Sequence, residues 1–150
     1  MTPKNIIVRP ANAEDISEVI LLLRELGYIS EEMSDFRRIW KDITSDPKMG
    51  ILVAVTDNVI SGYLSYSFKP QLRLSGLSME IDELSVGSKF RGGGIGTELL
   101  NHIRKKALEL GVKQIIISTN KDRDSYRRGF YTKNGFIEKN SAWLKIDLLK

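Results

Sequence analysis

Cysteine is absent from this chain, and histidine occurs once, at His102. A sequence without cysteine forms no disulfide, offers no thiolate to a metal ion and has no cysteine nucleophile. One histidine builds no histidine metal cluster by itself, and among the charged residues around it we expect His102 to be an ordinary surface or boundary residue. We therefore expect no metal site.

Long apolar runs are also missing. The longest, such as VILLL at residues 19–23, are far shorter than the roughly 20 residues of a membrane span. The opening MTPKNIIVRPANAED lacks the apolar core of a signal peptide. A length of 150 residues, with 41% hydrophobic and 28% charged residues, is typical of one globular domain. We expect a single domain over residues 1–150, a cytoplasmic location and no membrane partner.

Positive charge is concentrated in the second half of the chain. Residues 1–75 hold 9 Lys and Arg against 10 Asp and Glu, whereas residues 76–150 hold 14 against 9. This excess fits an anionic ligand, and scattered solvated lysines would give the same counts. A pI near 9.3 would also suit nucleic-acid binding. Because no stacking platform or recognition-helix motif accompanies it, we expect no nucleic-acid partner.

Hydrophobic periodicity predicts a mixed α/β domain of α+β type with helices covering a sheet. Strands are expected at residues 6–11, 51–55, 59–68, 78–86 and 112–119, with one or two more in 136–149. Helices are expected between an Asn12 cap and Gly27, and at residues 34–44, 95–110 and 125–133. Asp57 and Asn58 occupy the turn of a hairpin.

The strand at residues 78–86 has an irregular apolar pattern. Met79 and Ile81 are apolar at odd positions, whereas Leu84 and Val86 are apolar at even ones. Alternate side chains of a regular strand face opposite sides, so one extra residue near Asp82-Glu83 would place all four on one face. We expect a β-bulge there, because the acids in between are poor candidates for burial. The alternative is a strand that is buried on both faces.

Four glycines stand at the entrance of the helix expected at residues 95–110, within FRGGGIGTELL at residues 90–100. Glycine beside a helix weakens it by roughly 1 kcal/mol relative to alanine. The first N–H groups of a helix lack partners and attract anions, and glycines let this backbone approach a phosphate closely. We expect a phosphate or pyrophosphate site, and a flexible turn is the alternative.

Two common phosphate motifs do not match. A P-loop ends in Gly-Lys-Ser/Thr, whereas Thr97 and Glu98 follow Gly96 here, so a nucleoside triphosphatase is not expected. A dinucleotide fingerprint fails too, because neither register places a glycine in its last position. The spacing that fits is Arg-x-x-Gly-x-Gly, from Arg91 to Gly96.

With this spacing the sequence resembles the GNAT superfamily of acetyl-coenzyme A-dependent N-acetyltransferases. IDELSV at residues 81–86 precedes the motif, FYTKNGF at 130–136 follows it, and the opening looks like the family's first strand and helix. The resemblance implies acetyl-CoA as co-substrate. It also implies a GNAT-like fold: a central mixed, mostly antiparallel sheet of about six to seven strands, with a bulged, splayed middle and about four flanking helices.

The resemblance also implies which residues bind acetyl-CoA. The pantetheine arm pairs with the backbone of the bulged strand, and the acetyl carbonyl points at an amide near Leu84 or Ser85. The pyrophosphate lies on the amides of the glycine loop. The expected residues are Leu84, Ser85 and Val86 in the strand, Arg91, Gly92, Gly93, Gly94, Ile95, Gly96 and Thr97 in the loop, and Asn120 and Lys133 further on.

The helix before FYTKNGF departs from the family pattern. Many members carry Asn-x-x-Ala where this sequence has Asp124 and Arg127, and Asn120 is out of register. Contacts from this helix to the pantetheine arm are therefore open. A basic cluster that includes Lys133 either meets the 3′-phosphate of the coenzyme or forms a solvated face.

Acid–base residues are expected on both sides of the loop. The acceptor amine must lose a proton, and Glu80, Asp82 and Glu83 are the candidate bases. Tyr131 matches the family tyrosine that protonates the departing coenzyme A thiolate, and Tyr126 is a rival.

We therefore expect an N-acetyltransferase that moves an acetyl group from acetyl-CoA to a primary amine of a small molecule, by direct attack in a ternary complex. Two alternatives remain open: a non-catalytic acetyl-CoA-binding module of the same fold, and a protein or peptide N-acetyltransferase. The acceptor is not named by any motif, and a homodimer is compatible with the sequence.

Overall fold

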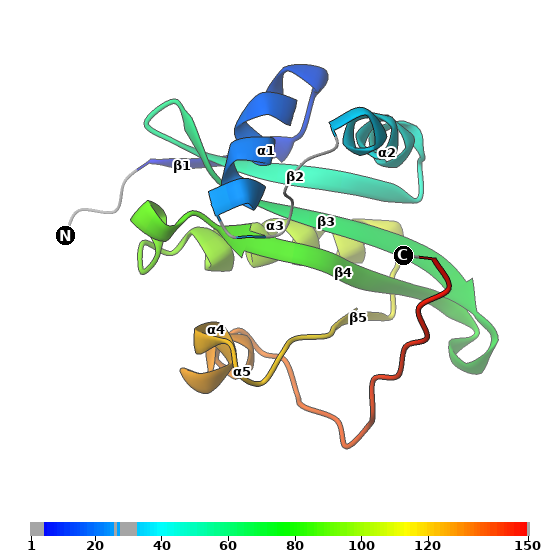
Figure 1. Cartoon of the computed structure of the whole chain (residues 1–150). Helices are drawn as coiled ribbons and strands as arrows, with labels where there is room; N and C mark the ends of the chain where they lie inside the picture. The colour runs from blue at the N-terminus through cyan, green and yellow to red at the C-terminus, as the bar shows by residue number, and fades with distance from the viewer. Residues whose placement is uncertain (1–4, 26, 28–32, 150) are drawn as a thin grey trace. The chain divides into compact units, whose positions relative to one another are not determined.

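The computed structural model describes residues 5–25, 27 and 33–149 (Figure 1). The chain divides into two compact units, Met1–Ile117 and Ser118–Lys150, and each is considered by itself. Within the described ranges, no helix has both the length and the apolar character to cross a membrane.

A five-stranded sheet forms the first unit, in the order β1-β2-β3-β4-β5. Its strands are β1 (Ile6–Pro10), β2 (Met49–Thr56), β3 (Val59–Gln71), β4 (Gly76–Val86) and β5 (Gln114–Ile117). The first four pair in antiparallel fashion, and β5 runs parallel to β4. Asp57 and Asn58 join β2 to β3 with positive φ angles of 51° and 64°, which confirms the predicted hairpin turn.

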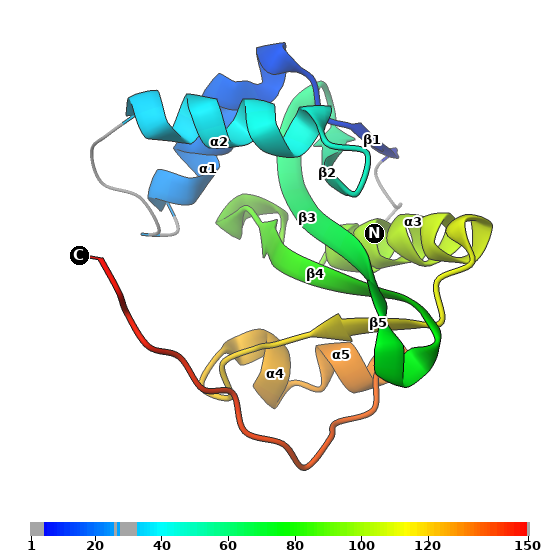
Figure 2. The same ribbon diagram turned by 90° about the vertical axis from the view of Figure 1, so that its right-hand side faces the viewer.

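Helices cover both faces of this sheet (Figure 2). On one face lie α1 (Ile16–Glu25) and α2 (Met33–Ser45), whose apolar side chains form a core with Val53 and Tyr63 of the sheet. On the other face lies α3 (Ile95–Leu110), which contacts β1 to β4. Its bounds are those predicted, and Gly111 ends it with a φ of 74°.

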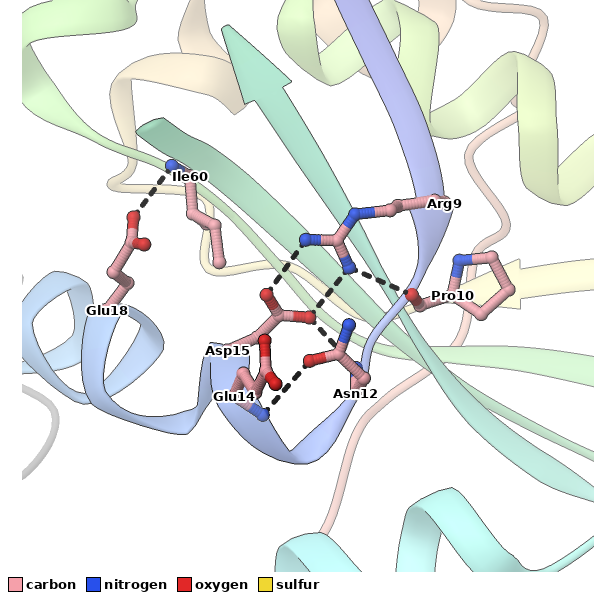
Figure 3. Close-up of polar contacts among 7 residues, drawn as sticks. All are labelled: Arg9, Pro10, Asn12, Glu14, Asp15, Glu18 and Ile60. Carbon is pink, nitrogen blue, oxygen red and sulfur yellow. Dashed lines mark hydrogen bonds and ion pairs between the residues drawn. The ribbon is translucent and has the colours of Figure 1, made fainter. Parts of the chain in front are cut away.

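Polar contacts fix the start of α1 to the sheet (Figure 3). Asn12 caps the short 3-10 turn Ala13–Asp15 in a capping box, as predicted. The Asp15 carboxylate accepts two hydrogen bonds from the Arg9 guanidinium, at 2.8 and 2.9 Å. About one turn further, Glu18 accepts a hydrogen bond of 2.9 Å from the Ile60 amide at the start of β3. Because β1 and β3 both hold it, α1 has a defined position over the sheet.

The second unit differs from the prediction in its helix. Residues 125–133 were expected to form one helix, but α4 (Asp124–Arg127) and α5 (Phe130–Lys133) are separate. Gly129 lies between them with a φ of 72°, a left-handed conformation that ends one helix and precedes the next. The described part of the chain therefore has five α-helices rather than about four.

The expected C-terminal strands are wrong as well. None of the described residues 134–149 lies in a strand, so the described sheet has five strands rather than six to seven. Leu144, Ile146 and Leu148 do alternate with Lys145 and Asp147, as a strand would require. A strand also needs a neighbour for its backbone hydrogen bonds, and alternation alone cannot supply one.

Candidate active site

The predicted β-bulge is present in β4. Ser65 of β3 is opposite Glu83, and the next residue of β3, Tyr66, is opposite Ile81, so Asp82 is the extra residue. The bulge corrects the side-chain parity along β4. Met79, Ile81, Leu84 and Val86 all pair with alternate residues of β3 and therefore share one face.

That shared face is the one that α3 covers. Ile81 is opposite Tyr66, whose ring lies 5.9 Å from the Nζ atom of Lys106 in α3. Glu80 and Glu83 consequently lie on the other face, the same as that of α1 and α2. The bulge therefore separates an apolar face from an acidic one within a single strand.

The three candidate bases lie close together at the bulge. The Ser65 hydroxyl donates to Oε2 of Glu83 at 3.0 Å, and the Ser67 hydroxyl donates to Oδ1 of Asp82 at 3.4 Å. No pattern in the sequence had indicated these two serines. Their spacing of two residues, on a strand that pairs with β4, is the signal that would have identified them.

The carboxyl of Asp82 has an unusual proton affinity. Although the residue as a whole is exposed, its carboxyl loses part of its hydration beside the sheet, and this raises its pKa. The negative charges of Glu80 and Glu83 raise the pKa further, whereas the Ser67 hydrogen bond and the charge of Lys69 lower it. A carboxylate with a raised pKa accepts a proton more readily than an ordinary one, which suits a general base.

Beyond the bulge, β4 has no partner in β5, because β5 ends at Ile117. Their parallel pairing runs from Ser78 opposite Gln114 to Ile81 opposite Ile117 and ends there. Residues 83–86 of β4 pair with β3 and have no strand on their other side in the described part of the sheet. The middle of the sheet is therefore bulged, as predicted.

Part of the β4 backbone beyond the bulge points away from β3. The Gly87 amide donates to the Ser61 carbonyl of β3 at 2.8 Å. Hydrogen-bonded and non-hydrogen-bonded pairs alternate along an antiparallel ladder, so Ser85 also bonds to β3. Leu84 and Val86 consequently direct their N–H and C=O groups away from β3, towards the side of β4 on which the described sheet has no paired strand beyond Ile81.

The glycine loop joins this strand to α3. A short 3-10 turn, Ser88–Phe90, follows β4, and the exposed residues 91–94 lead into the helix. Gly92 and Gly94 have φ angles of 80° and 86°. Gly94 is the N-cap of α3, and no side chain caps the first turn there. A Cβ atom at Gly94 would meet no atom within 4 Å, so the space beside the N-cap of α3 is open.

The cofactor candidates of the loop differ in exposure. Arg91, Gly92, Gly93 and Gly94 are exposed, Thr97 is half-buried, and Ile95 and Gly96 are buried. The buried Ile95 side chain packs inwards, which leaves only its backbone amide for a ligand. A loop of this kind offers backbone donors to an anion.

Tyr131, Asn120 and Lys133 belong to the second unit. The Tyr131 ring makes edge contacts with Phe130 and Phe136, whose centroids lie 5.1 and 6.0 Å away. Asn120 uses its side chain locally, because its Oδ1 accepts a hydrogen bond of 2.8 Å from the Asp122 amide. The Lys133 side chain is exposed.

The rival tyrosine is engaged in a different contact. The Tyr126 hydroxyl donates to a Glu138 carboxylate oxygen at 2.6 Å, and this hydrogen bond raises the pKa of Tyr126. Arg127 and Arg128, next to it, are exposed and lie near Asp122 and Asp124, at 4.0 and 3.5 Å. Tyr126 is thus a poorer proton donor to a leaving group than an ordinary tyrosine.

Metal ligands do not gather anywhere in the described ranges. No group of three or more His, Cys, Asp or Glu residues there has the arrangement needed to hold a metal ion. His102 is exposed, as expected, with its Nδ1 3.0 Å from the Glu98 carbonyl oxygen.

Comparison with known proteins agrees with this geometry. The family model of the acetyltransferase (GNAT) family matches residues 16–136. Aminoalkylphosphonate N-acetyltransferase of Salmonella typhimurium is 29% identical over 139 residues, which are 92% of this chain and 89% of that protein.

Solved structures share the fold. A transcriptional regulator from Bacillus halodurans superposes with a TM-score of 0.87 at 26% identity, over 96% of this chain and 100% of that one. Glucosamine-6-phosphate N-acetyltransferase from Arabidopsis thaliana superposes with a TM-score of 0.81 at 21% identity, over 95% and 99%. Together with the family match over residues 16–136, these findings show that the chain is an acyltransferase and belongs to the GNAT family of acetyltransferases.

Proposed function

We propose that the chain moves an acetyl group from acetyl-CoA to a primary amine of a small molecule, by direct attack in a ternary complex. The observation that carries the proposal is the bulge of β4. It places three acids beside a free strand edge, only a few residues before a glycine loop whose helix has no side-chain cap. The curated relative from Salmonella typhimurium, whose name describes an N-acetyltransferase of aminoalkylphosphonates, supports a small-molecule amine.

The donor site of this proposal combines the loop and the strand edge. The pyrophosphate lies on backbone amides from Arg91 to Thr97, where Gly94 leaves the approach open. The pantetheine arm pairs with the backbone around Leu84, Ser85 and Val86. Since Leu84 directs its amide away from β3, Leu84 rather than Ser85 donates to the acetyl oxygen. Such a donor stabilises the tetrahedral oxyanion by about 3 kcal/mol. Asn120 and Lys133 stay candidate coenzyme ligands on the family resemblance alone.

The chemistry then needs one base and one acid. A carboxylate among Glu80, Asp82 and Glu83 takes a proton from the acceptor ammonium, directly or through water, and the free amine attacks the acetyl carbonyl. When the tetrahedral intermediate collapses, the carbon–sulfur bond breaks and the thiolate takes a proton from Tyr131. The same three carboxylates attract a cationic acceptor.

Thiol release with a panel of amines tests the proposal. The panel contains aminoalkylphosphonates, amino sugars, polyamines and a peptide with a free N-terminus. We expect turnover with a small molecule. Replacement of the acting base (Glu80→Gln, Asp82→Asn or Glu83→Gln) and Tyr131→Phe should each lower kcat by about 10²-fold or more. Tyr126→Phe is the matched control and should retain activity. Unchanged turnover in all the variants would exclude these catalytic roles.

Binding of acetyl-CoA without acetylation of any amine in the panel would contradict a small-molecule acceptor of these classes. Acetylation of the peptide alone would favour a protein N-acetyltransferase.

The remaining features of the proposal concern the whole chain. We propose a single domain over residues 1–150, supported by a family match that spans both compact units, and a cytoplasmic location. We also propose a homodimer. Large apolar side chains near the C-terminus are 71–92% exposed, and a second copy would cover them: Ile137, Trp143, Leu144, Ile146, Leu148 and Leu149.

A further inference from the structure

The end of α1 touches the start of the glycine loop. Glu25 is the last residue of α1, and its Oε1 atom accepts a hydrogen bond of 3.1 Å from the Ser88 amide. The Ser88 hydroxyl donates to the same oxygen. Ser88 opens the 3-10 turn that leads into the loop, and the N-cap of this turn is Gly87, which has no side chain to cap it. The carboxylate of a distant helix therefore does the capping.

Packing one turn earlier on α1 supports the same contact. A Cβ atom at Gly87 would lie 3.2 Å from Cδ1 of Leu22 and 3.3 Å from Cδ2 of Phe90. The Leu22 side chain is buried, so α1 rests directly on the backbone that precedes the loop. Glycine at position 87 is what allows this close approach.

Few interactions within the loop itself fix its conformation. Residues 91–94 are exposed, and two of their glycines have positive φ angles. Glycine loses more conformational entropy on ordering than any other residue, so such a loop needs fixed ends. The α3 end is fixed by Ile95, which is buried against Gly62 of β3. At the β4 end, Glu25 holds Ser88.

The charge of Glu25 allows an electrostatic role and an anchoring role of this contact to be distinguished. Hydrogen bonds from the Ser88 hydroxyl and amide, with the charges of Lys89 and Arg91, lower the pKa of Glu25 and keep it ionised at neutral pH. A carboxylate next to a loop that binds an anion repels that anion. A purely electrostatic role and an anchoring role therefore predict opposite effects when the carboxylate is removed.

We propose that Glu25 is a positioning residue, which fixes the start of the glycine loop so that its amides are oriented before acetyl-CoA binds. The inference rests on the proposed function for the identity of the ligand. Anchoring lowers the entropy that the loop loses on binding, and the affinity for acetyl-CoA rises accordingly.

Three variants test the proposal by calorimetric titration with acetyl-CoA. Glu25→Ala removes the anchor and should weaken binding about tenfold, as expected for the loss of charge-assisted hydrogen bonds. Glu25→Gln keeps an acceptor oxygen but removes the charge, and should bind as tightly as the wild type or more tightly. Glu18→Ala is the matched control, because Glu18 also accepts from a backbone amide, that of Ile60, away from the loop. It should lose stability but keep its affinity.

Amide hydrogen exchange without coenzyme gives a readout that does not depend on the proposed function. The amides of Ser88, Phe90 and Gly93 are hydrogen-bonded and should exchange faster in Glu25→Ala, but not in Glu25→Gln or Glu18→Ala. Unchanged exchange, or tighter binding by Glu25→Ala, would overturn the inference. A wild-type protein that fails to bind acetyl-CoA would overturn the proposed function instead, and the exchange rates would still decide the role of Glu25.

Discussion

At the scale of single residues, the pair of Asp15 and Arg9 shows how one carboxylate holds two elements together. Its two hydrogen bonds to Arg9 and a third, of 2.8 Å, from the Asn12 amide lower the pKa of Asp15. The Asp15 side chain is 7% exposed, and that of Arg9 is 38% exposed. The pair is therefore partly desolvated and worth more than a surface ion pair.

Asp15→Asn should lower the free energy of unfolding by about 2 kcal/mol at pH 7, less than for a fully buried pair because Arg9 remains partly hydrated. The pKa of Asp15 is lower in the folded than in the unfolded state. Its contribution is therefore complete above the unfolded pKa of about 3.9 and is lost as the pH falls through the folded pKa. Urea denaturation of both proteins from pH 7 downwards measures this.

The control for Asp15 is an exposed pair in α2. Arg38 lies 3.3 Å from Asp35, with both side chains well exposed. Asp35→Asn should change the stability by less than about 0.5 kcal/mol at any pH. Equal effects of the two substitutions would contradict the role assigned to Asp15.

At the scale of elements, the bulge of β4 is a single extra residue with a local consequence. Deletion of Asp82 leaves the remaining pairs of β3 and β4 in a regular ladder, with Met79, Ile81, Leu84 and Val86 on one face. The strand should still fold, because no apolar side chain changes face. The edge beyond Ile81 should close towards β5 and exclude an extended ligand.

We predict that deletion of Asp82 weakens acetyl-CoA binding at least tenfold, or about 1.4 kcal/mol, whereas Asp82→Asn leaves it unchanged. The substitution removes the carboxylate but keeps the bulge, so the two variants separate the shape of the strand from its charge. Titration calorimetry measures both. Equal affinities in the two variants would mean that the bulge plays no part in donor binding.

The glycine loop provides a second prediction at this scale. Gly94 and Gly111 bound the same helix with φ angles of 86° and 74°, and a Cβ atom at either would meet no atom within 4 Å. Gly94→Ala and Gly111→Ala should therefore cost a similar left-handed strain of about 1 kcal/mol in thermal unfolding. Only Gly94→Ala should also weaken acetyl-CoA binding, because its methyl group enters the space in front of the amides. Equal binding by both variants would contradict the proposed pyrophosphate site.

At the scale of the whole molecule, the C-terminal segment of residues 134–149 forms neither a helix nor a strand. Its alternating side chains follow the pattern of a strand, yet Leu144, Ile146 and Leu148 are 82–87% exposed. A stable dimer buries about 1,600 Å² in total, and a second copy that covers these exposed apolar side chains would contribute to that area.

We predict that the wild-type protein elutes with a light-scattering mass of twice the 17.0 kDa of one chain. Ile146→Asp should yield the monomer, because a charge on the apolar side of the segment opposes its burial. Lys145→Ala, on the polar side of the same segment, should remain a dimer. A wild-type protein of monomeric mass at every concentration would exclude the dimer.

Much of the candidate site could be predicted from the sequence, because it depends on the spacing of neighbouring residues. The parity break in IDELSV predicted the bulge at the residue where it occurs, and the spacing from Arg91 to Gly96 identified the loop. Helix caps at Asn12 and Gly111 also came from neighbouring residues alone. By contrast, Ser65 and Ser67 were missed, because their contacts with the acids depend on which strand lies beside β4.

The sequence by itself therefore determined the family, the bulge, the glycine loop and the identity of the candidate acids. Each of these follows from the spacing of residues that are close together in the chain. Only the tertiary structure decided that Glu25 of α1 caps the loop, 63 residues away from Ser88. It also decided that the C-terminal alternation forms no strand in the described part of the chain. Both outcomes depend on which backbone groups meet across the fold, because a hydrogen bond needs its partner in space and not in sequence.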